Sequence, residues 1–501
     1  MGDIEGRHVR KLLRRVLGGV LLLLAAAVVL VGVLLFNAFS TRSVQLPVAA
    51  QPPLVFDEQA AAQRLGAAIR FRTISNFLNG DQSAAAFQAL HTHLAESFPT
   101  FHAAAKRETV GGYGLLYTWD GSDPAAKPIA LLAHQDVVPI APRTEGDWQE
   151  APFAGVVKDG FVWGRGAWDD KGSLLAILEA AEQLARQSFR PKRTIYFAFG
   201  HDEEVGGQRG AKAIANLLQS RGVKLDFVLD EGLIILDGIL KGLDKPAALI
   251  GISEKGYATL TLTATATPGH SSLPPRETAI GMLSAALARL EDQRMPAQIR
   301  GITGEMFATL APEMNWRNRV VLSNLWLLKP LLQRELEKSA ATEATIRTTT
   351  AITMFNAGNQ ENVLPGHAEA TVNFRLLPGD TRVSVAEHVR RVVGNDKIAV
   401  AGGPNDADPA PVSPTTSEAY RALNTTIRET FPDVVVAPGL MVGATDSRHF
   451  VGISDNIFRF APLRAKPEDL SRFHGTNERI SVANYADMIR FYRRLMQNSA
   501  G

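Results

Sequence analysis

The chain of 501 residues contains no cysteine. This absence excludes disulfide bonds and thiolate metal ligands, although it does not indicate an oxidising or a reducing compartment. The chain also has little net charge, formally +2, so no basic excess points to a nucleic-acid partner. Hydrophobic residues make up 46% of the sequence, which is enough for buried cores, and the length favours two to four domains.

The positive charge is concentrated at the N-terminus. Residues 1–45 hold six Lys/Arg and two Asp/Glu, whereas the rest of the chain holds 47 and 49. A basic tail, residues 1–15, precedes the uncharged stretch 16–36, which has about the length that a bilayer-spanning helix requires. A cleaved signal peptide is the alternative, but its apolar region is typically about 7–15 residues long, and the small residues Ala49 and Ala50 lie too far downstream for its cleavage site.

We therefore predict an uncleaved transmembrane signal anchor over 16–36. The basic flank places the N-terminus in the cytoplasm and the remaining chain on the outer side of the membrane, which is periplasmic, extracellular or lumenal. Residues 37–55, with three prolines, are predicted to be a linker.

Strand-like apolar runs alternate with helical patterns over residues 56–252. The runs are LLYTWDG, PIALLAHQDVV, TIYFAFG and LDFVLDEG, and amphipathic helices are expected at 172–188 and 209–221. This alternation predicts an α/β domain with a mostly parallel sheet covered by helices on both faces. Ligands of such sheets gather at the carboxyl ends of the strands.

The pattern changes after Ser253, where YATLTLTATATP alternates like a strand with one solvated face. With helices at 278–292 and 384–393 and the strands HAEATVNFRLLPG and KIAVAG, it predicts a small α+β unit over 253–403. Within this unit, residues 295–355 show no obvious order of elements. A Pro-, Gly- and Asp-rich segment then returns the chain to the first domain, whose second part we place at 404–501.

Side chains that can bind metal follow the strand-like runs. The set is rich in carboxylates, which suits a hydrolytic site whose metals keep a water better than a structural zinc site. Its members are His134 in HQD, Asp169 in GRGAWDDKG, Glu203 and Glu204 in DEEVGG, Asp230 in LDEG and, far downstream, His474 in HGTNE.

Each motif also has a simpler interpretation. A His-x-Asp triplet occurs by chance, although Asp136 could hold one ring nitrogen of His134 while the other binds metal. The glycine-rich turn could only cap the following helix, although Asp169 could bridge two cations. An acidic pair is usually a solvated loop, but a hydrolytic site needs one carboxylate that binds and a second, such as Glu203 beside Glu204, that acts as base.

Three assignments stay open on the residues alone. Glu231 competes with Asp230, and His449 in DSRHF competes with His474 for the last ligand position. His270, in PGHSS, lies outside the first domain, so it is either a surface histidine or a functional residue of another kind.

Taken together, HQD, GRGAWDDKG, DEEVGG, LDEG, GHSS and HGTNE resemble the zinc aminoacylase and carboxypeptidase family over residues of about 57–497. The TDSRHF string is most similar to carboxypeptidase S and to secreted N-acyl-amino-acid hydrolases. The resemblance implies a di-zinc exopeptidase domain with 253–403 as an inserted lid and dimerisation domain. It also implies two Zn²⁺ per subunit, with Co²⁺ or Mn²⁺ as possible substitutes, and a homodimer.

The resemblance assigns roles motif by motif. Glu203 becomes the general base for a metal-activated water, and Asp136 orients a ligand histidine. His270 would act in the active site of the partner subunit and polarise the scissile carbonyl. A cis peptide is expected between Asp169 and Asp170. The implied ligands are His134 and Asp230 for one zinc, Glu204 and His474 for the other, and Asp169 as the bridge.

Substrate recognition follows from the same resemblance. Arg375, in NFRLLPG, matches a lid arginine that binds the free carboxylate of the substrate, and a guanidinium suits a carboxylate bidentately. An exposed strand arginine is the alternative. Asn362 in NVLPG and the loop from Gly443 to Thr445 are further candidates for this recognition.

The leading functional hypothesis is a membrane-anchored zinc metallocarboxypeptidase that releases the C-terminal residue of short Gly-Xaa peptides. A second is an N-acyl-amino-acid amidohydrolase, and a third is a non-catalytic, membrane-tethered binding protein, against which the complete ligand set argues. One feature favours the second hypothesis, although helix packing explains it equally well. It is an apolar group that could line an acyl pocket: Trp316, Trp326, Leu327 and Leu328.

Overall fold

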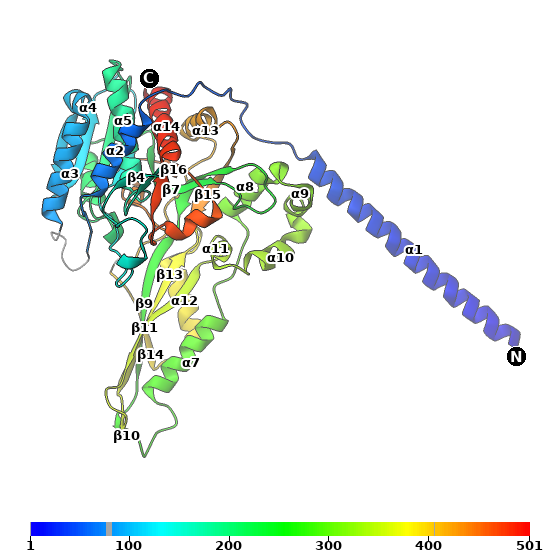
Figure 1. Ribbon diagram of the computed structural model, residues 1–501. Coiled ribbons are helices and arrows are strands. Elements are labelled where there is room, and N and C mark those ends of the chain that lie inside the picture. The colour runs from blue at the N-terminus through cyan, green and yellow to red at the C-terminus, as the bar shows by residue number, and fades with distance from the viewer. Residues whose placement is uncertain (1, 77–82, 405) are drawn as a thin grey trace.

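The computed structural model describes residues 2–76, 83–404 and 406–501. Its larger domain is built on an eight-stranded sheet (Figure 1). In spatial order the strands are β1 (Lys106–Val110), β2 (Gly114–Trp119), β6 (Ile195–Gly200), β3 (Ile129–His134), β7 (Val228–Leu236), β16 (Ile457–Ala465), β8 (Ala247–Glu254) and β15 (Val435–Met441).

The sheet is mixed, so the predicted mostly parallel arrangement holds only in part. Strands β6, β3, β7 and β16 are parallel neighbours, as are β8 and β15. At one edge β1 and β2 run antiparallel, because a tight turn joins them instead of a crossover helix. Gly111 in this turn has φ +63°, and a Cβ there would lie 1.7 Å from the carbonyl oxygen of Arg209, so only glycine fits.

Helices cover both faces of this sheet, as the alternation of apolar runs predicts. Odd-numbered residues of β3 such as Leu131 join one core with most of the helices, whereas Ala130 and Leu132 face a second core under α6 (Ala211–Ser220). Most helical residues of the first core come from α2 (Glu58–Ile69), α3 (Ala84–Ser97), α4 (Pro99–Ala104), α5 (Lys171–Arg186), α13 (Glu418–Thr430) and α14 (Val482–Ala500).

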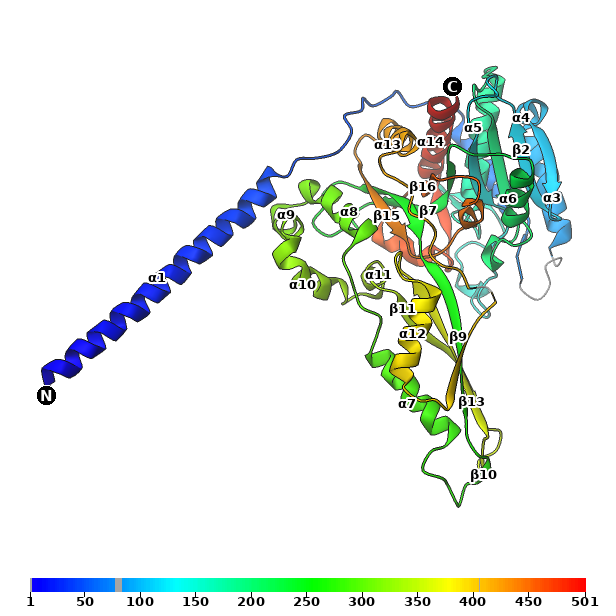
Figure 2. The ribbon, with the colours of Figure 1, turned by 180° about the vertical axis from the view of Figure 1, so that it is seen from behind.

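The smaller domain is a four-stranded antiparallel sheet that carries two helices on one face (Figure 2). In β9, every second residue from Ala258 to Ala264 is buried against the helices, as the sequence alternation predicts. The elements are β11 (Thr349–Ala357), β13 (His367–Leu376), β9 (Gly256–Thr265), β14 (Ile398–Gly402), α7 (Ala279–Asp292) and α12 (Arg382–Val393). A short pair, β10 (Gly269–His270) and β12 (Val363–Leu364), forms the distal end.

The segment without predicted elements folds into helices between α7 and β11. They are α8 (Gly301–Leu310), α9 (Trp316–Ser323), α10 (Leu325–Leu336) and α11 (Ala340–Glu343). Helix α8 does not join the core of the smaller domain, the predicted lid; Leu310 at its end packs with Val435 and Ala437 of β15 in the larger domain.

At the N-terminus, α1 (Gly2–Ser40) projects away from the folded body (Figures 1 and 2). Within the described part of the chain, its segment Arg10–Ser40 is the one helix long and apolar enough to cross a membrane. The same length and composition also fit a signal sequence.

Candidate metal centre and substrate cavity

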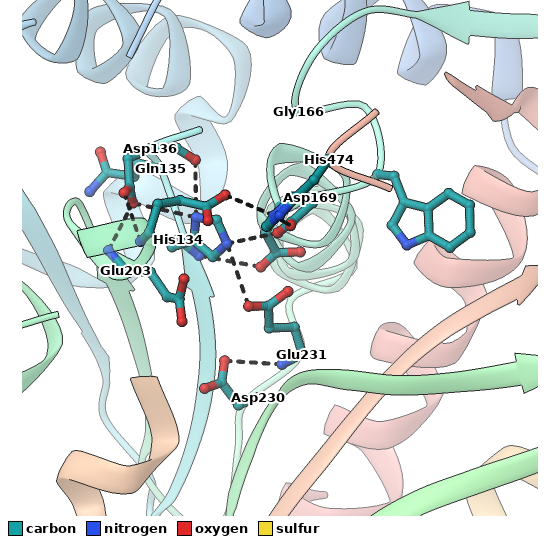
Figure 3. A network of polar contacts seen from close by, with 12 residues as sticks. His134, Gln135, Asp136, Gly166, Asp169, Glu203, Asp230, Glu231 and His474 are labelled. Carbon is teal, nitrogen blue, oxygen red and sulfur yellow. Dashed lines mark hydrogen bonds and ion pairs between the residues drawn. The ribbon is translucent and has the colours of Figure 1, made fainter. Parts of the chain in front are cut away.

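The centre of the site is Asp169, whose two carboxylate oxygens face two histidines (Figure 3). His134 Nε2 lies 2.9 Å from Asp169 Oδ1, and His474 Nε2 lies 2.7 Å from Asp169 Oδ2. His134 ends β3, Asp169 precedes α5, and His474 comes from a loop some 300 residues away in sequence. A carboxylate shared in this way has the geometry of a bridge between two cations.

Two acidic residues complete the cluster. His474 Nε2 lies 3.4 Å from Glu204 Oε1, and His134 Nε2 lies 3.5 Å from Glu231 Oε1. Potential ligand atoms lie within 4.8 Å of one another in two groups, His134 with Asp169 and Glu204, and His134 with Asp170 and Glu231. The competitor His449 lies elsewhere, with Nε2 3.2 Å from the carbonyl oxygen of Gly206.

The structure places Glu231, and not Asp230, against His134. The pairing of β7 with β16 is irregular here, because the register shifts between Asp230 and Leu233. The carboxylate of Asp230 accepts two backbone hydrogen bonds: Oδ2 accepts one from the N–H of Ser447 (2.7 Å), and Oδ1 accepts one from the N–H of Glu231 (3.0 Å). The contact of Glu231 with His134 makes it a candidate for the same ligand position, and the assignment of Asp230 stays a prediction.

The electrostatics of the cluster call for a cation. Burial raises the pKa of Glu231 and of Asp170 well above the usual range, and neighbouring carboxylates add to this effect. Hydrogen bonding to Asp169, and then to Glu204, raises the pKa of His474 to about 10. Several carboxylates buried around one point are unfavourable unless cations neutralise them. Two histidines and several carboxylates without thiolates therefore fit a pair of divalent ions.

Asp136 connects the cluster to the acidic loop after β6. Its Oδ1 and Oδ2 accept hydrogen bonds from the backbone N–H groups of Glu203 and Glu204, both at 3.1 Å. Its Oδ1 also lies 3.4 Å from Nδ1 of His134, the ring nitrogen that faces away from Asp169. Asp136 therefore positions both the histidine and the loop that carries the two glutamates.

Glu203 lies beside the cluster but belongs to neither of the two groups of potential ligand atoms. Glu203 lines the cavity described below. Burial raises its pKa well above the usual range; the charge of His134 lowers this pKa, and the charge of Glu231 raises it further. A carboxyl group with a raised pKa beside metal ligands can accept and return a proton near neutral pH.

The cluster opens into a cavity of about 510 Å³ between the two domains. Two arginines line the cavity, Arg375 from β13 of the smaller domain and Arg448 from the larger domain. Burial lowers the pKa of Arg375, and the charge of Arg448 makes a smaller contribution in the same direction. The Arg375 guanidinium lies over the ring of Tyr257, 4.8 Å from its centroid. The apolar part of the lining includes Trp168, Ile234, Met441 and Phe473.

Of the other candidate residues, His270, Asn362 and Thr445 do not line this cavity, whereas Gly443 does. His270 is exposed in β10, where its Nδ1 accepts a hydrogen bond from the N–H of Ser272, and Asn362 adjoins it at the distal end of the lid. Gly443 lines the cavity, whereas Thr445 is buried behind it and donates its N–H to Glu254. Among the described residues lining the cavity there is no Trp316, Trp326, Leu327 or Leu328, so the expected apolar acyl pocket is not formed by these side chains.

Two functional contacts were absent from the sequence predictions. Arg448 lies in the TDSRHF string, in which the sequence analysis names His449 but not the arginine as a candidate. Glu478, in HGTNE, is fully buried and accepts hydrogen bonds from the backbone N–H groups of Gly166, Trp168 and Asp169. The predicted cis peptide between Asp169 and Asp170 is present.

A buried histidine–carboxylate cluster at the carboxyl ends of α/β strands, facing a cavity between two domains, is typical of metal-dependent hydrolases. The chain belongs to peptidase family M20/M25/M40, whose model matches residues 130–498. The family resemblance drawn from the motifs is thereby confirmed, and the protein is a hydrolytic enzyme of this family.

Curated relatives match over most of the chain. The N-fatty-acyl-amino acid synthase/hydrolase PM20D1.1 of Danio rerio is 45% identical over 86% of this chain and 84% of its own length. The probable carboxypeptidase S-like 2 of Dictyostelium discoideum is 43% identical over 87% and 85%, respectively. Carboxypeptidase S of Saccharomyces cerevisiae is 32% identical over 82% and 78%.

Solved structures share the fold. An M20 family metallo-carboxypeptidase, Sso-CP2 from Sulfolobus solfataricus, superposes with a TM-score of 0.61 at 19% identity, covering 88% of this chain and 99% of that one. The Bacillus subtilis YXEP protein, described as a dinuclear metal-binding peptidase from the M20 family, has a TM-score of 0.52 at 15% identity over 87% and 98%.

Proposed function

We propose that the protein is an amidohydrolase that uses two divalent metal ions to release an amino acid with a free carboxylate from an apolar N-acyl group. The proposal rests on one cavity that is lined both by potential metal ligands and by arginines. The histidine–carboxylate cluster lies at one side, and Arg375 and Arg448 line the same cavity. A substrate with an amide and a nearby carboxylate matches both.

The metal ligands follow from the contacts. His134 and Glu231 would hold one ion, His474 and Glu204 the other, and Asp169 would lie between them. Zinc is the proposed metal, and cobalt or manganese would suit the same histidine and carboxylate ligands. When bound, such ions lower the pKa of a water and polarise the amide carbonyl.

The protonation steps belong to Glu203. Its carboxylate takes a proton from the attacking water as the new carbon–oxygen bond forms, and it returns that proton to the amide nitrogen as the carbon–nitrogen bond breaks. Burial holds its pKa above the usual range, which makes Glu203 a stronger base for the proton of the water than an exposed glutamate. Asp136 keeps Glu203 in place through the backbone hydrogen bond.

The two arginines select the carboxylate. Two guanidiniums that share a partly desolvated cavity repel each other, and an anion between them relieves this repulsion. The stack of Arg375 on Tyr257 restricts the side chain before the substrate arrives.

The acyl group distinguishes two substrate classes. The relatives named as N-fatty-acyl-amino acid synthase/hydrolases, at 40–45% identity, favour an apolar acyl group, as does the apolar lining from Trp168, Ile234, Met441 and Phe473. Short Gly-Xaa peptides are the second candidate, favoured by the carboxypeptidase S-like relatives. Both substrates present the same amide and carboxylate to the site.

The lid supports an assembly in which each site is completed by a second copy. His270 lies exposed on the distal end of the lid and outside the residues that line the cavity of its own chain. We include in the proposal that it reaches the cavity of the partner subunit in a homodimer and stabilises the developing oxyanion there.

The N-terminal helix completes the proposal. Helix α1 would cross the membrane as an uncleaved anchor, with the basic residues of its N-terminal half in the cytoplasm and the catalytic domain outside. An uncharged stretch from Val16 to Phe36 and the exposed apolar side chains of α1 support this topology.

The test is amino-acid release by the purified full-length protein from N-lauroyl-leucine, Gly-Leu and N-lauroyl-leucinamide, each with and without a chelator. We expect chelator-sensitive cleavage of N-lauroyl-leucine, restored by added Zn²⁺, and at least about tenfold slower cleavage of the leucinamide, since it lacks the charged group that pairs with the arginines. Preference for Gly-Leu would assign the peptidase function instead. Chelator-insensitive cleavage, or none with metal bound, would refute the proposal.

A further inference from the structure

Helix α10 is apolar and uncovered. Its sequence, LWLLKPLLQREL, contains seven Leu or Trp residues, yet none of its residues is buried. Trp326 is 63% exposed and Leu331 60%, and Trp316 on the neighbouring α9 is also 60% exposed. A surface helix this rich in leucine normally buries one face, and a group of exposed apolar residues marks an interaction surface.

This surface is attached to the end of α1. Asn324, between α9 and α10, accepts a hydrogen bond from Asn37 and donates one to the carbonyl of Leu34, both at 2.9 Å. Arg319 of α9 donates to the carbonyls of Ala38 and Thr41, both at 2.6 Å. The carbonyl of Ala38 lies in the last turn of α1, where carbonyl groups have no partner within the helix, so the bond from Arg319 satisfies it.

The attachment fixes where α9 and α10 lie relative to α1. Figures 1 and 2 both show α9 beside the end of α1 from which the rest of that helix projects, with α10 continuing from α9. The uncharged stretch of α1 ends at Phe36, within the turns that Asn324 and Arg319 contact. If α1 crosses a bilayer, the two helices are held at the level of its outer interface.

Their charge suits that position. Helices α9 and α10 together have four Lys/Arg and one acidic residue, Glu335. Tryptophan prefers the headgroup level of a membrane, and cationic side chains beside an apolar face favour phospholipid headgroups. The polar and the apolar groups of this segment therefore match one surface.

We propose that α9 and α10 lie in the headgroup region of the membrane that α1 crosses, with Trp316, Trp326 and Leu331 inserted toward the acyl chains. The proposal rests on the membrane anchoring included in the proposed function. It adds a second attachment, so that the catalytic body is held against the bilayer instead of turning freely on the linker. A reversible interfacial helix beside a spanning helix is enough for this.

The absence of cysteine makes the test direct, because one introduced cysteine is the only labelling site. Full-length protein with Leu331→Cys carries an environment-sensitive fluorophore and is reconstituted into vesicles of phosphatidylcholine and phosphatidylserine. Val383→Cys on α12, 66% exposed and on the lid, is the matched control. Alkaline carbonate extraction reports separately whether α1 is inserted.

We expect a blue-shifted emission at position 331 and quenching by spin-labelled lipid at least about twofold stronger than at position 383. Equal, water-like emission at both positions in protein that resists extraction would overturn the proposal while leaving the anchor intact. Blue-shifted emission without quenching by lipid would also overturn it, since a protein contact would then cover α10. Extraction by carbonate would refute the anchor and this proposal together.

A second measurement does not depend on the cysteine variant. Brominated lipids should quench the tryptophan fluorescence of the unmodified protein, and Trp316→Phe with Trp326→Phe should remove most of that quenching. Quenching that persists in this double variant would assign it to other tryptophans and contradict the proposal.

Discussion

The carboxylate of Glu478 and the guanidinium of Arg165 form a fully buried ion pair with a 2.5 Å contact between Oε2 and Nη1. The other nitrogen, Nη2, donates to the backbone carbonyls of His474 and Gly475. Since Glu478 Oε1 also accepts the N–H of Asp169, this pair connects the turn that carries the central carboxylate to the loop that carries the distant histidine. Two proposed metal ligands far apart in sequence, Asp169 and His474, are thus positioned by one polar contact.

Glu478→Gln should weaken metal binding. The amide keeps the shape of the side chain but removes the charge that holds Arg165, so Asp169 and His474 lose their fixed separation. We expect a loss of about 10–100-fold in metal affinity or activity, as for other groups that orient ligands. Metal titration of the chelated protein checks this. Glu108→Gln, in an exposed pair with Arg221, is the control and should bind metal normally; equal metal affinity in both variants would refute the positioning role.

Arg375→Met and Arg448→Met should each reduce cleavage of carboxylate substrates. Loss of a charged hydrogen bond predicts a fall of about 10–100-fold in kcat/KM for N-lauroyl-leucine. Kinetics with N-lauroyl-leucinamide provide the internal control, because that substrate has no carboxylate to lose. An equal fall for both substrates would mean that the arginines support the fold and not substrate recognition.

Glu203→Gln should retain both metals and lose turnover. The glutamine has no carboxylate to accept the proton of the water, which predicts a loss of about 10²–10⁴-fold in kcat. Metal content measured on the same sample separates this effect from damage to the cluster. Residual activity near that of the unmodified protein would contradict the role of Glu203 as general base.

His270→Ala and Glu203→Gln offer a test of the dimer. If His270 acts in the partner subunit, a heterodimer of the two inactive variants contains one site with both residues intact. Random mixing after dissociation should then restore about a quarter of the unmodified activity. Size-exclusion chromatography confirms the exchange of subunits, and exchanged but inactive mixtures would exclude action across the dimer.

The sequence predicts the position of the cluster better than the identity of its members. The strand-like runs before His134 and Glu204 become the parallel neighbours β3 and β6, and the carboxyl ends of parallel strands lie at one edge of a sheet. Asp169 reaches the same place from the turn before α5. The choice between Asp230 and Glu231 depends on which of two neighbours faces inward, and a strand register is not visible in LDEG alone. The contact of Glu478 cannot be predicted from HGTNE, because no sequence pattern connects a single glutamate to a turn 310 residues earlier.

The helical insertion shows the other limit of the sequence. Residues 295–355 showed no order of elements because their apolar residues do not follow one buried face: α8 packs on the larger domain, whereas α10 packs on no core. Amphipathic periodicity reports burial within the protein. A helix whose apolar side chains face outward, as in α10, therefore gives an indistinct pattern.

Lys255, between β8 and β9 at the junction of the two domains, should make stability depend on pH. Its Nζ donates to the carbonyls of Ala344 and Arg347, and burial, with a contribution from Arg375, lowers its pKa from 10.5 to about 7. Between these values the unfolded chain binds more protons than the fold, so the free energy of unfolding rises with pH from about 7 to 10. Lys255→Met removes this contribution, and the Tm of the unmodified protein minus that of the variant should increase over this range by on the order of 2–4 °C. Lys397→Met, at an exposed lysine paired with Glu277, is the control, and its Tm difference from the unmodified protein should not change with pH. If the Tm difference for Lys255→Met is constant as well, Lys255 keeps its proton in the folded protein throughout this range.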